Sequence, residues 1–268
     1  MSHYNVYVIT KDGDIDAALA PFDENLEVDP YIDVRKEDVV PNFRNRYSRL
    51  LVQWKENAAR AAAKGNEEEA GRAKAMVADI SHDLDLSDEE IYQRETDGRD
   101  LDEDGNILST YNPDSKWDWY EEGGRFWNGI RTKDGRNTNQ CLVSDVLLVP
   151  GSNDQALYEK EKRLFLIYTG QASAETDEEK KAQKENIWNP SYYFDHFGDA
   201  DTFALCQIVS QPYAVLRADG TWVEPGEMGW WGVSSARPGA MADFVRGFAG
   251  LMQKEPQDYI CTCVDCHI

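Results

Sequence analysis

The C-terminal quarter of the chain carries the pattern that most restricts how it can fold. The apolar run Thr202–Ser210 has the length of a buried strand and predicts one. The pair Asp219-Gly220, a strong turn signal, predicts a hairpin between Tyr213–Arg217 and Thr221–Glu224. A last β-rich segment, Tyr259–Ile268, predicts a C-terminal strand. These segments indicate a sheet whose strands are joined by short connections.

A helix and an N-terminal strand complete this pattern. Apolar side chains after Pro238 recur at helical spacing and predict an amphipathic helix, carried by Met241, Phe244, Val245, Phe248, Leu251 and Met252. Residues 4–10 are β-branched and aromatic, and we expect them to join the same sheet. Together the segments predict an α+β fold with a mainly antiparallel sheet, formed with the N- and C-terminal strands, and helices on one face.

The region between these ends predicts two helices side by side. Apolar residues recur at helical spacing from Asn42 to Ala63, and residues 67–80 repeat the pattern after Gly65. We therefore expect a helical-hairpin insertion at 42–80 within a single domain that spans residues 1–268.

Shorter signals mark further elements. Residues 141–149 are mostly apolar and predict a buried strand. Two pairs have the spacing of capping boxes and predict helix starts, Ser87 with Glu90 and Thr176 with Glu179.

The chain is strongly acidic. Its 268 residues include 28 Lys and Arg against 50 Asp and Glu, a formal net charge of −22. Such a charge repels nucleic-acid phosphates and acidic membrane surfaces, so we expect no direct nucleic-acid partner and no membrane contact. No apolar run is long enough to span a membrane and no secretory signal is visible, which predicts a cytoplasmic protein. Residues 79–104 alone contribute −10 and favour a partner with a basic surface, although acidity also serves solubility.

The block Tyr111–Trp127 is the densest candidate for a binding site. Indole rings offer flat stacking surfaces, cationic side chains bind anions, and the Gly123-Gly124 pair allows close approach of the backbone. This set suits a planar, charged ligand such as a nucleotide. The residues assigned to ligand binding are Lys116, Trp117, Trp119 and Arg125. A small aromatic core under a long loop is an equally consistent interpretation.

A second block, Gly226–Gly232, places Trp230 and Trp231 next to each other between glycines. Adjacent indoles cannot both face one core, so at least one should meet solvent, a ligand or a partner. The functional interpretation is a lid over a ligand that both Trp residues help to bind. The alternative is an interface loop or a plug in the core.

The C-terminal tail contains side chains that could transfer protons. Alternation along a strand places Asp265 and His267 on one face, about 7 Å apart, where they could act as an acid/base pair. A histidine that only covers the sheet edge is the alternative. His3 would lie near His267 if the first and last strands are neighbours. The candidate catalytic residues are Asp118, Glu227, Asp265 and His267.

Haem and zinc are weaker interpretations of the same tail. Cys263, Cys266 and His267 have the spacing of a haem-attachment motif, but covalent attachment needs export. Zinc would also need Cys261, and in a strand Cys266 points away from the other ligands. We expect five reduced cysteines.

Calcium is the one metal with a candidate loop. Asp100, Asp102 and Asp104 before Gly105 fit the start of an EF-hand loop. Tyr111 occupies the twelfth position, where a bidentate glutamate is needed. We therefore expect no cofactor, with Ca²⁺ at this loop as the alternative.

Four motifs give the chain a resemblance to a protein family. They are the opening MSHYNVYVI with APFDENLEV, the block STYNPDSKWDWYEEGGRF, the run WVEPGEMGWWG and the tail VDCHI. In this order they are similar to a family of bacteriophage and prophage proteins whose members begin MSHFTVLVI, carry NPxSKWDWYxxGGRW and GEMGWWG, and end VDCHI. Phe126 stands where the family usually has Trp. The resemblance implies a phage origin and a shared site, and it implies no particular reaction.

Two classes of function follow. The first is a phage-encoded acidic accessory protein that binds a host or defence-system component in the host cytoplasm, in host takeover or anti-defence. The alternative is a protein that binds or processes a nucleotide-like small molecule in a Trp-lined pocket. Because the sequence shows no recognisable nucleophile or metal motif, binding is favoured over catalysis.

Overall fold

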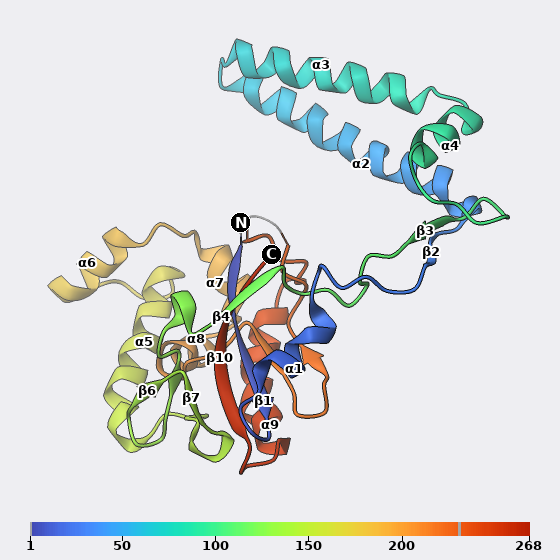
Figure 1. Ribbon diagram of the computed structural model, residues 1–268. Helices are drawn as coiled ribbons and strands as arrows, with labels where there is room; N and C mark the ends of the chain where they lie inside the picture. Colours follow the sequence, from blue (N-terminus) through green and yellow to red (C-terminus); the bar gives the residue numbers. More distant parts are fainter. Residues whose placement is uncertain (1, 230–231) are drawn as a thin grey trace. The chain divides into compact units, whose positions relative to one another are not determined.

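The chain forms two compact units in the computed structural model, which describes residues 2–229 and 232–268 (Figure 1). Unit 1 comprises Met1–Leu26 and Asn112–Ile268, and unit 2 comprises Glu27–Tyr111. Unit 1 therefore contains both ends of the chain, and unit 2 is one continuous segment.

Unit 1 is built on a sheet whose centre pairs the two ends of the chain. Strands β1 (His3–Thr10) and β10 (Ile260–His267) are antiparallel and paired along their whole length. In the described residues the sheet has six strands, and the other four are β4 (Trp119–Glu122), β7 (Gln140–Leu142), β8 (Ala214–Leu216) and β9 (Trp222–Val223). Strands β4 and β7 both pair with the edge of β10 opposite β1, β8 is parallel to β1, and β9 is antiparallel to β8. The predicted α+β fold is confirmed, with both terminal strands and the hairpin in one mainly antiparallel sheet.

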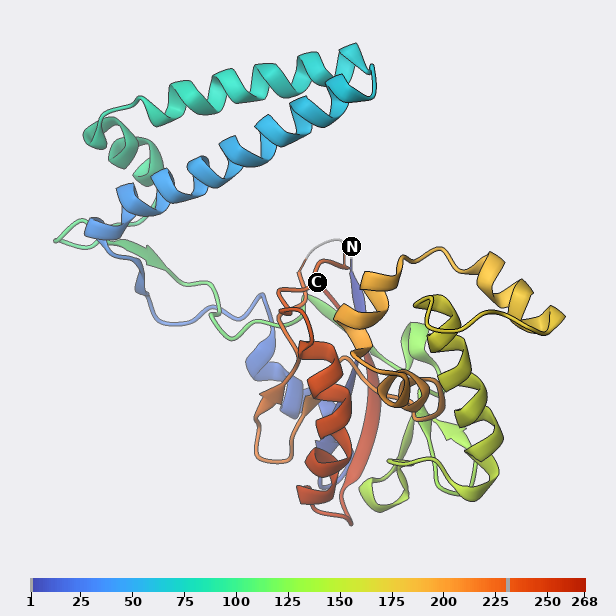
Figure 2. The same ribbon diagram turned by 180° about the vertical axis from the view of Figure 1, so that it is seen from behind.

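Alternation along β1 supplies a core to each face of the sheet. Tyr7 lies on one face and packs against α9 (Ala240–Lys254), the amphipathic helix expected after Pro238. Val6 lies on the other face, in a cluster that includes α1 (Ile15–Leu19). Figure 2 shows α9 in front of the sheet. The period-2 pattern of an apolar strand thus buries both of its faces. Because α9 and α1 pack on opposite faces, the expectation that helices lie on one face is wrong.

Helix α8 (Ala200–Ile208) occupies the segment Thr202–Ser210, so the prediction of a strand there is wrong. The carboxylate of Asp199 starts the helix by accepting the Thr202 backbone N–H at 2.7 Å. Burial on several sides leaves this helix without a polar stripe, and a short apolar run then looks the same in a helix and in a strand. Its buried residues are Thr202, Phe203, Ala204 and Ile208.

Three further helices accompany α8, namely α5 (Gln155–Tyr168), α6 (Asp177–Glu185) and α7 (Pro190–Phe197). Phe165, Tyr193 and Phe203 form an aromatic cluster between α5, α7 and α8. Helix α6 begins with the predicted capping box, because Thr176 and Glu179 each bind the other's backbone N–H.

The prediction of one buried strand at 141–149 is wrong in its length. Only Gln140–Leu142 pairs with β10, and a single 3-10 turn, Val143–Asp145, follows. The chain leaves the ladder at Ser144, whose N–H donates to the Gln257 carbonyl oxygen. Earlier in the chain, β5 (Ile130–Arg131) and β6 (Asn137–Thr138) form a small antiparallel ribbon.

Unit 2 contains a helical hairpin of α2 (Lys36–Ala63) and α3 (Glu67–Leu84), followed by α4 (Asp88–Thr96). Both hairpin helices extend beyond the expected range 42–80. Helix α2 begins before Pro41, because this proline removes only one backbone hydrogen bond, the one to the Glu37 carbonyl oxygen. The acidic side chains of Glu37 and Asp38 also stabilise the first turn through the helix dipole. The predicted capping box at the start of α4 is present. Strands β2 (Tyr31–Val34) and β3 (Ile107–Ser109) pair at the base of the unit.

We expect unit 1 to fold without the helices of unit 2. The two chain segments that lead into unit 2 lie side by side, since the Val28 N–H donates to the Thr110 carbonyl oxygen at 3.0 Å. Replacing residues 29–109 by a short Gly-Ser linker should therefore leave a protein that unfolds cooperatively, because both sheet cores lie in unit 1. Urea unfolding followed by Trp fluorescence and by circular dichroism measures this. Loss of the cooperative transition would contradict it.

Candidate functional site

Three sequence blocks meet where β1 begins and β10 ends. The aromatic block contributes β4, which places Trp119 opposite His267. The glycine-rich block is held by Ser2, whose hydroxyl donates to the Gly229 carbonyl oxygen at 2.7 Å and accepts the Gly232 N–H at 2.5 Å. The C-terminal tail contributes the end of β10 itself. Residues far apart in the sequence therefore surround one end of the β1–β10 ladder.

Two histidines lie at the centre of this end. His3 and His267 are directly opposite each other in the ladder, and their ring centroids are 4.9 Å apart in an edge contact. Directly opposite residues of an antiparallel pair point to the same face, so both rings share one face of the sheet. We call these two residues the histidine pair.

Each ring of the histidine pair is fixed by a carboxylate. The Nδ1 atom of His3 lies 2.9 Å from Asp265 Oδ1, and the Nδ1 atom of His267 lies 2.5 Å from Asp118 Oδ1. Because a carboxylate accepts, each Nδ1 donates, and Nε2 is left as the second ring nitrogen. The Nε2 atom of His267 is buried and has no hydrogen-bond partner within the part of the chain that the structure describes. An unpaired buried nitrogen marks a place for a ligand or substrate, because buried polar atoms are nearly always paired.

The Gly123-Gly124 pair brings the backbone against Asp265. The carboxylate of Asp265 is 1% exposed, and its second oxygen accepts the Arg125 backbone N–H at 2.8 Å. Gly124 has a φ of +44°, and a Cβ there would lie 2.5 Å from the Asp265 side chain. Glycine is required because it permits both the positive φ and the close approach. The close backbone approach that Gly123-Gly124 allows is therefore made to the carboxylate of Asp265.

Exposed groups of the aromatic block border the histidine pair. The Trp119 ring centroid is 6.3 Å from that of His3, and Trp119 is 49% exposed. The Arg125 side chain is exposed, and its own backbone is bound to Asp265. An exposed indole beside the histidine pair and an exposed cationic side chain next to Asp265 can contact a planar anionic ligand.

Other residues assigned to the site from the sequence lie elsewhere. The Trp117 indole is 8% exposed in the core on the opposite sheet face, and its N–H donates to the Leu19 carbonyl oxygen, so it cannot stack on a ligand at the histidine pair. The Lys116 ammonium pairs with Glu224 at 2.9 Å and with Glu227 at 3.3 Å. Their charges are therefore used in an ion-pair network. Trp230 and Trp231 lie outside the described residues.

Cysteines of the tail are buried in the two sheet cores. Cys261 and Cys263 belong to the core of α9, and Cys266 belongs to the core of α1, so the expected alternation holds. All five cysteines, each within the described residues, are free thiols. No group of three or more His, Cys, Asp or Glu side chains in the described ranges is arranged to hold a metal ion.

The loop considered for calcium uses its central carboxylate internally. Asp102 accepts the backbone N–H groups of Asp104 and Asn106 at 3.0 and 2.8 Å, and also the Asn106 side-chain amide. The Asn106 hydrogen bonds lower the pKa of Asp102 below its usual range. Asp100 and Asp104 do not join it in a ligand group among the residues that the structure covers.

We expect the thiols to react slowly in the folded protein and the fold to weaken at alkaline pH. Burial raises the pKa of Cys206 to about 12, and burial with the nearby Asp265 carboxylate raises that of Cys263 to about 12. In the unfolded chain these thiols ionise near the ordinary thiol pKa of about 8.5, whereas in the folded chain they stay protonated to higher pH. The free energy of unfolding is therefore unaffected by them below about pH 8.5 and falls as pH rises toward 12. Thiol titration with a disulfide reagent, with and without urea, and urea midpoints at pH 7 and pH 10 measure both effects. Fast labelling of the native protein, with equal midpoints, would contradict the prediction.

Sequence reasoning left two groups of site residues unassigned. His3 was considered only as a neighbour of His267, because its position depends on strand pairing across the whole chain. Tyr192, His196 and Gln211 line a cavity, and the only sequence signal for it was a local excess of aromatic residues.

Comparison of the chain with protein-family models, with curated proteins and with solved structures finds no match. A search of the described helices likewise finds none with the length and apolar character that crossing a bilayer requires. The geometry of the site is therefore the basis for a functional proposal.

Proposed function

We propose that this chain processes a nucleotide-like small molecule by general acid–base catalysis at the histidine pair. The observation that carries the proposal is the contact of two imidazoles, each of which donates Nδ1–H to its own carboxylate. A carboxylate on Nδ1 orients an imidazole and stabilises its protonated form, so that Nε2 can accept and return protons.

Cleavage of a phosphodiester is the reaction that such a pair serves best. One neutral imidazole accepts the proton of the attacking water or sugar hydroxyl at Nε2. The other, protonated, donates a proton to the leaving oxygen, so that one proton is taken and one is given. Trp119 would contact the substrate beside the imidazoles, and Arg125 would contact the phosphate.

The test is a small panel of phosphodiesters incubated with the purified protein. The probes are adenosine 2′,3′-cyclic phosphate, adenosine 3′,5′-cyclic phosphate and the dinucleotide ApA, with products followed by ³¹P NMR and chromatography. We expect cleavage of at least one probe, with a rate that falls on both the acid and the alkaline side because the two imidazoles must differ in protonation. Absence of cleavage across the panel at pH 5 to 9 would count against the proposal.

A second candidate function is supported by the charge of unit 2. Among the described residues, ion pairs engage only Asp83, Asp88 and Glu95 of the twelve acidic side chains in residues 79–104. The uncompensated carboxylates favour docking on a host or defence-system protein with a basic surface. With the resemblance to phage proteins, this supports an accessory role in the host cytoplasm, in host takeover or anti-defence.

Comparing the full chain with the 29–109 deletion variant tests this second function. Both proteins are used to capture partners from bacterial lysate at low and high salt, and bound proteins are identified by mass spectrometry. We expect a basic protein that the full chain retains at low salt, that high salt releases, and that the deletion variant does not bind. Capture of the same proteins by both variants would contradict it.

A further inference from the structure

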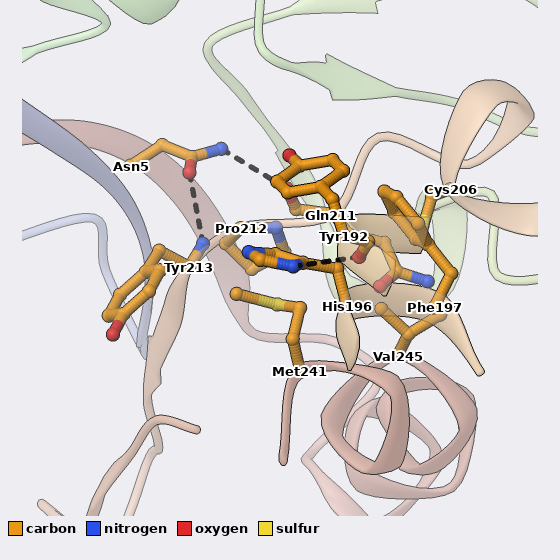
Figure 3. Close-up of a pocket in the computed structure, with 10 residues that line it drawn as sticks. All are labelled: Asn5, Tyr192, His196, Phe197, Cys206, Gln211, Pro212, Tyr213, Met241 and Val245. Atoms are coloured by element: carbon orange, nitrogen blue, oxygen red, sulfur yellow. Dashed lines mark hydrogen bonds between the residues drawn. The ribbon is translucent and has the colours of Figure 1, made fainter. Parts of the chain in front are cut away.

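A pocket of about 290 Å³, drawn in Figure 3, is lined by residues of β1, α7, α8 and α9. Asn5 lines it, lies opposite Asp265 in the ladder, and is two residues along β1 from His3, which places the two side chains about 7 Å apart on one face. Apolar side chains, including Phe197 and Met241, form much of the remaining wall. The size is at the lower end of the roughly 300–1,000 Å³ typical of ligand pockets, which suits one heterocycle.

A row of three aromatic rings in contact ends at this pocket. Tyr192 stacks on Trp188, with centroids 4.3 Å apart, and contacts His196 in a tilted arrangement, with centroids 4.0 Å apart. The His196 Nδ1–H donates to the Tyr192 carbonyl oxygen at 3.0 Å, which fixes the imidazole plane. In Figure 3 the ring of His196 is drawn between Tyr192 and Met241. A fixed planar ring at a pocket wall is a stacking surface for a planar ligand.

Gln211 presents an unused acceptor at the same pocket. Its Oε1 atom is buried and has no donor among the described residues, although buried acceptors are nearly always paired. Its backbone is held in place, because the Asn5 amide donates to the Gln211 carbonyl oxygen at 3.3 Å and accepts the Tyr213 N–H at 2.9 Å. The side-chain amide carries an acceptor beside a donor. Adenine offers the complementary edge, an amino group beside a ring nitrogen.

We propose that this pocket binds the adenine base of a nucleotide, with His196 stacking on the ring and Gln211 accepting the amino N–H. A neighbouring pocket of about 380 Å³ shares His196 and Met241 and is also lined by Arg237 and Gly232. It gives room for sugar and phosphate, and Gly232 leads back to Ser2 beside the histidine pair. The reaction that would follow binding rests on the function proposed above. Binding of the base is a separate claim and can be measured without turnover.

Calorimetric titration of the full chain with two nucleosides that lack a phosphodiester tests the pocket. Adenosine carries the amino group, and purine riboside has the same shape without it. We expect adenosine to bind about tenfold more tightly, because only adenosine satisfies the buried Gln211 oxygen. Gln211→Leu should weaken adenosine binding about tenfold and remove the difference between the nucleosides. Gln207→Leu, an exposed glutamine on α8, is the matched control and should bind as the parent protein does.

The outcomes separate the pocket from the catalytic proposal. Equal affinity for both nucleosides in the parent protein, absence of adenosine binding, or tighter binding of uridine would overturn the adenine pocket, and none of these depends on a variant that must fold. His267→Asn should bind adenosine normally. If adenosine binds as expected but His267→Asn still cleaves the phosphodiester panel, the pocket stands and the catalytic proposal fails.

Discussion

His267→Asn is expected to lower kcat for cleavage of the phosphodiester probe by about 10²- to 10⁴-fold, the range that a general acid or base contributes. The asparagine amide can still donate to Asp118 from the position of Nδ1, but it has nothing at the position of Nε2. The variant therefore removes proton transfer and keeps the hydrogen bond. Steady-state kinetics at several pH values, with unfolding in urea as a check on folding, measure the effect.

A matched control separates this effect from the general loss of a histidine. His82 is exposed on α3 in unit 2, and His82→Asn should leave kcat within twofold of the parent value. Asp118→Asn should lower kcat less than His267→Asn and should shift the pH profile, because Asp118 is a positioning residue. If His267→Asn retains kcat within twofold, the histidine pair is not the acid–base site.

The second large effect is expected at Gly124. In Gly124→Ala the new methyl group would lie 2.5 Å from the Asp265 side chain, so this buried carboxylate must move away from His3 and from the Arg125 N–H. Each hydrogen bond to the buried carboxylate that is lost costs about 1.5–3 kcal/mol. The positive φ of the position adds roughly 1–2 kcal/mol for a residue with a Cβ. Because both hydrogen bonds of Asp265 are lost, we expect the free energy of unfolding to fall by about 3 kcal/mol or more. Activity should be lost as well.

Gly135→Ala is the control for the backbone contribution alone. Gly135 also has a positive φ, +87°, but among the described residues no atom lies within 4 Å of the Cβ that would be added. Its loss of stability should stay near 1–2 kcal/mol and its activity should be retained. Urea unfolding of both variants gives the difference between them, which isolates the contact with Asp265. Equal losses in the two variants would show that this contact does not hold the site together.

The sequence by itself determined the elements that depend on neighbouring residues. The turn at Asp219-Gly220, the capping box at Thr176 and the apolar spacing of α9 are local signals, and each element lies where it was predicted. The α+β class follows from the order of such elements. Residues 202–210 show the limit of this reasoning, because an element surrounded by other helices loses the polar stripe that distinguishes a helix from a strand.

The tertiary structure alone decided which chemically active side chains meet. His3 and His267 are 264 positions apart, and only the register of β1 on β10 places them opposite each other. A shift of one strand by one residue would put the two rings on opposite faces of the sheet. Trp117 and Trp119 have the spacing of one strand face, but β4 begins at Trp119, so the first indole enters a core and the second borders the site. Composition could identify these residues as candidates. Their roles depend on pairing between distant segments, which is a property of the fold and not of the local sequence.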